Sequence, residues 1–338
     1  MSKVGVWITV RNEEKHLRGA LESVLSQSMN DLTLYVSNNW STDGSLQIID
    51  RFAKEDSRVV IWHPPEFLAG IPHMKWVWSK LTAETNHTYT IHLGGHDWWP
   101  EGHLELMVAR MDQDLALMQS ARPVPIEVAL LYSDTMQVNQ QREVVGRFMD
   151  ITQLGQTPKA MVPHVAITTM NSPQFFGLWN ERVRKKIKVR YPTGGWDHLI
   201  VAEAALHGQI LFEGRTAMRM LGPDPDPTGL EGYGKKHFSK ERLAAGIADF
   251  VDQLRWYSEL VRESLDYCPP EAQPLHYALG ITSVISLYLA LRGQNLLAVP
   301  GAMDTFNNNE HVKMILGGAQ HIGKHFEMLL ESVPPVGD

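Results

Sequence analysis

The sequence predicts an α/β protein that begins as a parallel, Rossmann-like sheet and ends in a helical region. Strand and amphipathic-helix patterns alternate over residues 4–62, which is the rhythm of a parallel sheet. Residues 224–229 (Asp-Pro-Asp-Pro-Thr-Gly) suit neither a helix nor a central strand, and longer helical patterns follow them. We therefore expect an α/β domain at residues 1–223 and a helical region at residues 224–338.

Composition and charge narrow the class of protein. The chain has 338 residues, 43% hydrophobic and 20% charged, so it can bury a core. Its net charge of -7 argues against a general nucleic-acid-binding surface. The single cysteine, Cys268, excludes an intrachain disulfide and a cysteine-based zinc site. The first residues enter a strand pattern without a signal peptide, so we expect a cytoplasmic protein.

The elements of the first domain follow from hydrophobic patterning. Short runs of β-branched, aromatic or apolar residues predict strands at residues 4–10, 32–36, 59–62, 89–93, 128–132 and 209–212. Apolar residues at helical spacing predict helices at residues 13–27, 45–53, 74–81, 101–111 and 198–207. Residues 142–163 show no assignable pattern.

The C-terminal region reads as three long helices, at residues 240–267, 274–297 and 311–331. The apolar run at residues 278–291 is shorter than the roughly 20 residues that a membrane-spanning helix needs. We expect a buried helix there, with a homodimer contact or a peripheral membrane contact as the alternatives.

Residues 89–100 (Tyr-Thr-Ile-His-Leu-Gly-Gly-His-Asp-Trp-Trp-Pro) are the strongest candidate for a ligand site. The strand pattern runs into two glycines, which let another group approach the backbone closely. His96 and Asp97 follow as a possible metal-ligand pair, and Trp98 and Trp99 supply large flat faces. Ligands of open α/β sheets bind at the carboxyl ends of the strands, where these residues are expected to lie.

Three blocks resemble family 2 glycosyltransferases of the GT-A fold. Residues 8–14 (Ile-Thr-Val-Arg-Asn-Glu-Glu) resemble the first-strand motif, and residues 37–45 (Ser-Asn-Asn-Trp-Ser-Thr-Asp-Gly-Ser) resemble the Asp-Asp-Gly-Ser-Thr-Asp-Gly-Thr turn. Residues 93–100 occupy the place of the Asp-x-Asp metal loop. More weakly, residues 176–179 are similar to the strand that enters the acceptor side, and Trp196-Asp197 to the position of the catalytic base.

This resemblance implies a GT-A, Rossmann-like α/β/α sandwich that transfers a sugar from a nucleotide-diphosphate sugar to an acceptor hydroxyl. Asp197 is the implied base, which corresponds to inversion at the anomeric carbon, and Asp97 is the implied ligand of Mn²⁺ or Mg²⁺. The implied donor-binding residues are Thr9, Arg11, Asn38, Asn39, Gly95 and His96. The candidate acceptor-binding residues are Trp98, Trp99, Asp134 and Trp196. The acceptor itself is not indicated.

The chain departs from the family pattern at the donor side. The paired acids after the second strand are Asn38 and Asn39, the usual tyrosine is Arg11, and the first acid of the metal motif is Gly95. A single aspartate can hold Mg²⁺ or Mn²⁺ when the diphosphate supplies further oxygens. An imidazole such as that of His96 favours Mn²⁺.

Plainer roles stay open for several of these residues. Asn38 and Asn39 also suit a turn, Trp98 and Trp99 a core, and Asp197 a helix N-cap. His96 and Arg11 also suit ordinary surface positions, and the basic run at residues 182–186 is expected to be a solvated surface.

Two other functions remain alongside the transferase. A catalytically degenerate nucleotide-sugar-binding protein of the same fold is suggested by Gly95 and the two asparagines. A nucleotidyltransferase is a weaker alternative, because it would need a glycine-rich phosphate loop after the first strand, and residues 11–14 contain no glycine.

Overall fold

The computed structural model describes residues 2–120, 127–148, 173–190 and 196–222, and, in the C-terminal region, residues 252, 255–257, 259–270 and 273. The chain divides into two compact units. The first contains residues 1–157 and 169–226, and the second contains residues 158–168 and 227–338.

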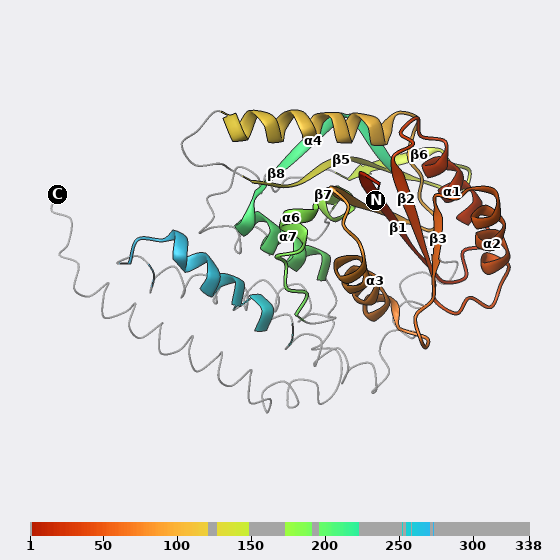
Figure 1. The fold of residues 1–338 in the computed structure, drawn as a ribbon, viewed down its shortest axis with the longest axis horizontal. Helices are drawn as coiled ribbons and strands as arrows, with labels where there is room; N and C mark the ends of the chain where they lie inside the picture. The colour runs from red at the N-terminus through yellow and green to blue at the C-terminus, as the bar shows by residue number, and fades with distance from the viewer. Residues whose placement is uncertain are drawn as a thin grey trace. The chain divides into compact units, whose positions relative to one another are not determined.

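The first unit is built on an eight-stranded mixed sheet (Figure 1). The strand order is β3-β2-β1-β4-β7-β5-β6, with β8 paired to β5. Strands β3, β2, β1 and β4 are parallel, whereas β7 runs antiparallel to both β4 and β5. The strands are β1 (Val4–Val10), β2 (Leu32–Asn38), β3 (Val59–Trp62), β4 (Tyr89–Gly94), β5 (Val128–Val138), β6 (Val144–Phe148), β7 (Leu178–Asn180) and β8 (Gln209–Leu221).

Helices cover both faces of this sheet, so the predicted α/β/α class is confirmed (Figure 1). Alternate residues of β1 point to opposite faces, and Val4, Val6, Ile8 and Val10 join the core formed with α1, α2 and α4. The described helices of this unit are α1 (Leu17–Leu25), α2 (Ser45–Glu55), α3 (Gly70–Glu84), η3 (Pro173–Phe176), α4 (His103–Ser120), α6 (Glu181–Arg184) and α7 (Trp196–His207).

The opposite face of the sheet is packed with aromatic rings. Trp7 of β1 lies against His92 of β4, with ring centroids 4.0 Å apart. Trp78 of α3 contacts Trp7 edge to face at 6.5 Å and Trp196 of α7 at 6.2 Å. Phe175 of η3 contacts Trp7, Trp78 and Trp196. These rings fix α3, α7 and η3 to one side of the sheet.

Several elements differ in length from the sequence expectation. Helix α1 begins at Leu17 rather than residue 13, because residues 12–14 hydrogen-bond to the loop after β2. Strands β5 and β8 extend to Val138 and Leu221, because they pair with each other along their length. Strand β6 lies in a segment that the sequence left unassigned.

The basic run at residues 182–186 is not a uniformly solvated surface, and the prediction is wrong for Arg184. Its side chain is fully buried and forms a double contact with Glu181, whose Oε1 also accepts from Thr90 Oγ1 at 2.6 Å. Arg184 also donates to Thr82 Oγ1 at 3.1 Å. Arg182, by contrast, is 68% exposed. One cation of the run therefore completes a buried polar network.

In the second unit, the described residues from Asp252 to Ser264 are helical and lead into η4 (Leu265–Tyr267). Trp256, Leu260 and Val261 are buried there. The expected helices at residues 274–297 and 311–331 lie outside the described residues, so a homodimer or membrane contact through them stays a prediction. Among the residues that are described, no helix has the length and apolar character needed to cross a membrane.

Candidate functional site

The candidate site lies at the carboxyl ends of three neighbouring parallel strands. Thr9 of β1 is in register with Ser37 of β2 on one side and with Gly94 of β4 on the other. The segments that leave these strands therefore begin beside one another. This brings residues 11–14, 38–45 and 94–97 to one edge of the sheet, as the sequence predicts for a ligand site.

Hydrogen bonds join the loops after β1 and β2. Asn12 takes a left-handed φ of 58°, and its Oδ1 accepts from Thr42 N at 2.8 Å. Glu14 Oε2 accepts from Gly44 N at 2.9 Å, while Glu14 N donates to Asp43 Oδ2 at 3.1 Å. Two of the three blocks that carry the family resemblance, residues 8–14 and 37–45, thus hold each other in place.

The two asparagines after β2 are buried, each at 2% exposure. Asn39 pairs with the backbone of Leu68: its Nδ2 donates to Leu68 O at 2.6 Å, and its Oδ1 accepts from Leu68 N at 3.1 Å. Asn38 Oδ1 accepts from Ser41 N at 3.4 Å. These bonds give both side chains a structural role, and their contact with a donor base stays a prediction.

An exposed aromatic side chain lies against Arg11 at this edge, and a second exposed ring follows Asn39 in the chain. The guanidinium of Arg11 lies 4.8 Å from the Phe67 ring centroid, and its Nη1 donates to Asn39 O at 2.9 Å. Phe67 is 58% exposed, and Trp40 is 54% exposed with a left-handed φ of 56°. Trp40 Nε1 donates to Pro64 O at 3.2 Å. Sequence reasoning missed Phe67 and Trp40, although Trp40 stands at the glycine position of the turn motif.

Asp97 is held rigidly at the same edge. It is 2% exposed, and its Oδ1 accepts from the backbone N–H of Leu221 at the end of β8, at 2.9 Å. Its backbone N–H donates to Gly94 O at 3.1 Å, and a Cβ at position 94 would collide with Asp97 Oδ2. Burial raises the pKa of Asp97 above its usual value. The glycine before the loop thus makes room for this carboxylate.

His96 lies between two carboxylates. Its Nδ1 is 3.1 Å from Glu13 Oε1, and its Nε2 is 3.9 Å from Asp97 Oδ1. The hydrogen bond to Glu13 raises the pKa of His96, against the effect of burial, and the charge of Asp97 acts in the same direction. Glu13 was not among the predicted site residues, because its approach depends on how β1 and β4 pair.

The two tryptophans of the loop have different surroundings. Trp99 is 3% exposed and stacks on His103 with ring centroids 5.3 Å apart, so it belongs to the core. Trp98 forms an isolated antiparallel bridge with Arg219, and its ring lies 4.8 Å from the guanidinium carbon of Arg142. Trp98 is therefore a side chain that anchors the loop; acceptor binding by either ring stays a prediction.

The remaining predicted site residues lie on other elements. Asp197 is in the first turn of α7, with 32% of its side chain exposed. Trp196 is 3% exposed, within the aromatic packing against α3. Asp134 of β5 pairs with Arg147, with Oδ2 to Nη2 at 2.5 Å. Their proposed contacts with an acceptor remain untested.

The residues around Asp97 fit a cation that is shared with a bound substrate. In the described parts of the chain, no group of three His, Cys, Asp or Glu side chains is placed to hold a metal ion. Asp97 with Glu13 and His96 nevertheless offers oxygen and nitrogen donors of the kind that Mn²⁺ accepts. One or two carboxylates with substrate phosphates are a common way to bind such a cation.

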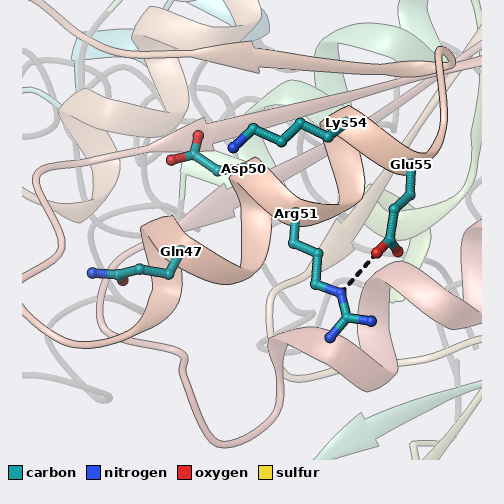
Figure 2. A pocket seen from close by; sticks show the side chains of 5 residues that line it. All are labelled: Gln47, Asp50, Arg51, Lys54 and Glu55. Atoms are coloured by element: carbon teal, nitrogen blue, oxygen red, sulfur yellow. Dashed lines mark hydrogen bonds and ion pairs between the residues drawn. The ribbon is translucent and has the colours of Figure 1, made fainter.

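A separate hollow lies on the exposed side of helix α2, and Figure 2 shows the side chains that line it. Arg51 Nε donates to Glu55 Oε1 at 2.8 Å across one end of it. The charges are mixed and the described lining comes from one helix, so we assign no function to this hollow. Its lining residues are Gln47, Asp50, Arg51, Lys54 and Glu55.

The mixed sheet with helices on both faces is an α/β fold of the GT-A type. The family model described as glycosyl transferase family 2 matches residues 6–171. Residues 6–171 therefore match this family, as the sequence predicts, and the match supports a transferase.

Solved structures share the fold at low sequence identity. A structure of S. aureus TarS 1-349 in complex with UDP-GlcNAc aligns with a TM-score of 0.51 and 12% identity, covering 96% of this chain and 92% of that chain. Another structure of TarS 1-349 aligns with a TM-score of 0.50 and 13% identity, covering 96% of this chain and 91% of that chain. The mannosyltransferase PcManGT from Pyrobaculum calidifontis, in complex with GDP-Man and Mn²⁺, aligns with a TM-score of 0.48 and 12% identity. The alignment covers 94% of this chain and 87% of that chain. No curated protein matches the chain significantly.

Proposed function

We propose that this glycosyltransferase uses a nucleotide-diphosphate sugar as donor and a divalent cation, and transfers the sugar with inversion to an acceptor hydroxyl. The observation that carries the proposal is the buried Asp97 carboxylate, fixed by Leu221 N at the edge where β1, β2 and β4 end. A carboxylate in that position meets the diphosphate of a donor bound in the usual place for α/β folds.

The donor base is expected beside Arg11. Phe67 offers an exposed aromatic face against Arg11, and Trp40 offers another in the loop after β2. Any nucleobase can stack on such a face, whatever polar groups its edge carries. UDP-GlcNAc is bound by TarS, a protein of the same fold, so it is the first donor to test. Thr9 lies between Ser37 and Gly94 in the sheet and is expected to contact the ribose or the diphosphate of the donor.

The chemistry needs a charge-neutralising site and a base. Asp97, with His96 beside it, would hold Mn²⁺ or Mg²⁺, and such a cation neutralises charge that develops on the leaving diphosphate. Asp197 accepts the proton of the acceptor hydroxyl as its oxygen bonds to the anomeric carbon and the bond to the diphosphate oxygen breaks. The partial exposure of Asp197 leaves its carboxylate accessible to an acceptor.

The test is release of nucleoside diphosphate from UDP-GlcNAc and GDP-Man, with water and a panel of glycans as acceptors. Asp97→Asn keeps the acceptor atom for Leu221 N but removes the charge, so we expect the turnover number to fall about a hundredfold without loss of thermal stability. Asp197→Asn should lower turnover with little change in donor affinity. Asp50→Asn, on α2, is the matched control.

One observation favours a second candidate, a nucleotide-sugar-binding protein without turnover. Asn39 stands where the family has an acid, and both polar atoms of its side-chain amide are hydrogen-bonded to the Leu68 backbone. This candidate predicts that UDP-GlcNAc or GDP-Man binds but that neither is cleaved with any acceptor. Measurable turnover that depends on Asp97 excludes it.

A further inference from the structure

The glycine at position 95 leaves a space that another side chain fills. A Cβ built on Gly95 would lie 3.1 Å from Cγ and 3.6 Å from Cβ of Glu13, and 3.5 Å from Thr9 O. Only the distance to Glu13 Cγ is tighter than an ordinary contact of a Cβ atom; the other two are ordinary van der Waals contacts. A side chain at position 95 would therefore require the Glu13 side chain to shift by a few tenths of an ångström.

The backbone of Glu13 is fixed on both sides. Its N–H donates to Ser45 Oγ at 2.8 Å, which ties it to the start of α2. Its carbonyl accepts from His16 N at 3.0 Å and Leu17 N at 2.9 Å, which ties it to the start of α1. From this fixed backbone position, the Glu13 carboxylate reaches His96 in the loop after β4.

The carboxylate of Glu13 reaches the same imidazole as Asp97. His96 has Glu13 Oε1 at 3.1 Å from Nδ1 and Asp97 Oδ1 at 3.9 Å from Nε2. The Glu13 side chain is 23% exposed and that of Asp97 is 3% exposed, so solvent screens their charges only in part. A diphosphate cannot approach two partly buried carboxylates favourably unless a cation lies between them.

We propose that Glu13 supplies, from the loop after β1, the second carboxylate for the cation that the donor diphosphate brings to Asp97. Gly95 is then the companion change that gives the Glu13 side chain its room. This inference rests on the proposed function, because the cation is shared with a nucleotide-diphosphate donor. It assigns a ligand role to a carboxylate that is hydrogen-bonded to His96 in this structure.

The test measures Mn²⁺ binding rather than activity. Loss of the free-Mn²⁺ electron paramagnetic resonance signal is followed as protein is added, with saturating UDP or GDP and without nucleotide. In the wild type we expect tight Mn²⁺ binding only with a nucleotide. Glu13→Gln, which keeps the shape, should weaken that binding at least tenfold, whereas Glu14→Gln in the same loop should leave it unchanged.

A rescue experiment separates a ligand from a merely structural side chain. Gly95→Asp alone should weaken Mn²⁺ binding, because its Cβ crowds Glu13. The double variant Glu13→Ala/Gly95→Asp removes the crowding and restores a second carboxylate, so binding should return to within a few-fold of the wild type. Circular dichroism and melting temperature confirm that each variant is folded.

The other results overturn the inference in distinguishable ways. If Glu13→Gln binds Mn²⁺ as the wild type does, or the double variant recovers nothing, Glu13 is not a ligand and the proposed function stands. If the wild type binds nucleotide without any effect of Mn²⁺, the inference fails together with the cation part of the proposed function, and the nucleotide-sugar donor stands. If no nucleotide binds at all, the proposed function fails together with the inference.

Discussion

At the residue scale, neighbouring asparagines after β2 are held in different ways. Asn39 uses both its donor and its acceptor on the Leu68 backbone, whereas Asn38 uses its acceptor on Ser41 N. An aspartate has only acceptors when it is ionised. The family acids therefore cannot simply be restored at both positions of this chain.

Asn39→Asp should lower stability by about 1–3 kcal/mol, because a buried carboxylate would face the Leu68 carbonyl without a donor. It should also weaken nucleotide binding, since Leu68 adjoins Phe67. Asn38→Asp keeps its acceptor for Ser41 N and should cost less. Urea unfolding of both variants checks this order, and an equal loss for the two would contradict it.

At the element scale, helix α1 is coupled to the hairpin between β5 and β6. Arg142, at a left-handed φ of 64°, reaches Gly19 of α1, where an added Cβ would lie 2.5 Å from its Nη2. The same guanidinium covers Trp98, which adjoins Asp97. The hairpin thus holds the loop after β4 from the side of α1.

Gly19→Ala should therefore fail to stabilise the protein. Alanine normally adds about 0.5–1 kcal/mol over glycine inside a helix, but here it displaces Arg142 from Trp98, a contact of comparable value. In an Arg142→Ala background the same change should be stabilising. Guanidinium unfolding of the wild type, the two single variants and the double variant measures this coupling. If the two changes in unfolding free energy add, the position of Arg142 does not depend on the glycine.

His92 of β4 is a second element-scale feature, because its ring nitrogens have no hydrogen-bond partner among the described residues. It is packed between Trp7 and Phe176, with ring centroids 4.0 and 5.2 Å away. Burial lowers the pKa of His92 to about 3, and the pKa values of His103 and His73 to about 3 and about 4. These histidines are neutral in the folded protein at neutral pH.

Acid should consequently destabilise the fold well before the carboxylates titrate. Below a pH of about 6.5 these histidines bind protons in the unfolded chain but stay neutral in the folded chain. The free energy of unfolding therefore falls as the pH drops toward the folded pKa values. Each such histidine accounts for about 2 kcal/mol between pH 7.5 and 5. His92→Phe should remove one share of this loss and cost little at pH 7.5. The free energy of unfolding is measured against pH for both proteins, and an equal loss between about pH 7.5 and 5 in the variant and the wild type would refute this.

Local patterning predicted the elements whose limits are set by their own residues. Strands β1 and β3 have the expected bounds, because each run is apolar and ends at a polar turn. The start of α1 and the ends of β5 and β8 were misplaced, since hydrogen bonds to distant segments decide them. Their partners are not visible in a local window of sequence.

The site divides in the same way. The edge with Asp97 follows from strand order and the two glycines, both readable in the sequence. The roles of Glu13 and Arg184 were missed, because one depends on the fit between two loops and the other on a buried partner, Glu181. Composition and spacing carry no information about such contacts.

At the scale of the whole molecule, the proposed donor site lies in the first unit alone. Every contact that supports it joins residues of that unit, from Thr9 to Leu221. The second unit is a candidate for acceptor or partner binding, and we propose no residue there. Donor binding can therefore be measured on the full chain without knowing the acceptor.

The most direct test of the central claim is a thermal-shift screen of UDP, GDP, CDP and dTDP and their sugar conjugates, each with and without Mn²⁺. A ligand that binds only the folded state stabilises it by about 2.7 kcal/mol at a hundredfold excess over its Kd. The account predicts a melting-temperature rise for one nucleotide that requires Mn²⁺ and disappears in Asp97→Asn. No shift with any nucleotide, with or without Mn²⁺, would contradict it.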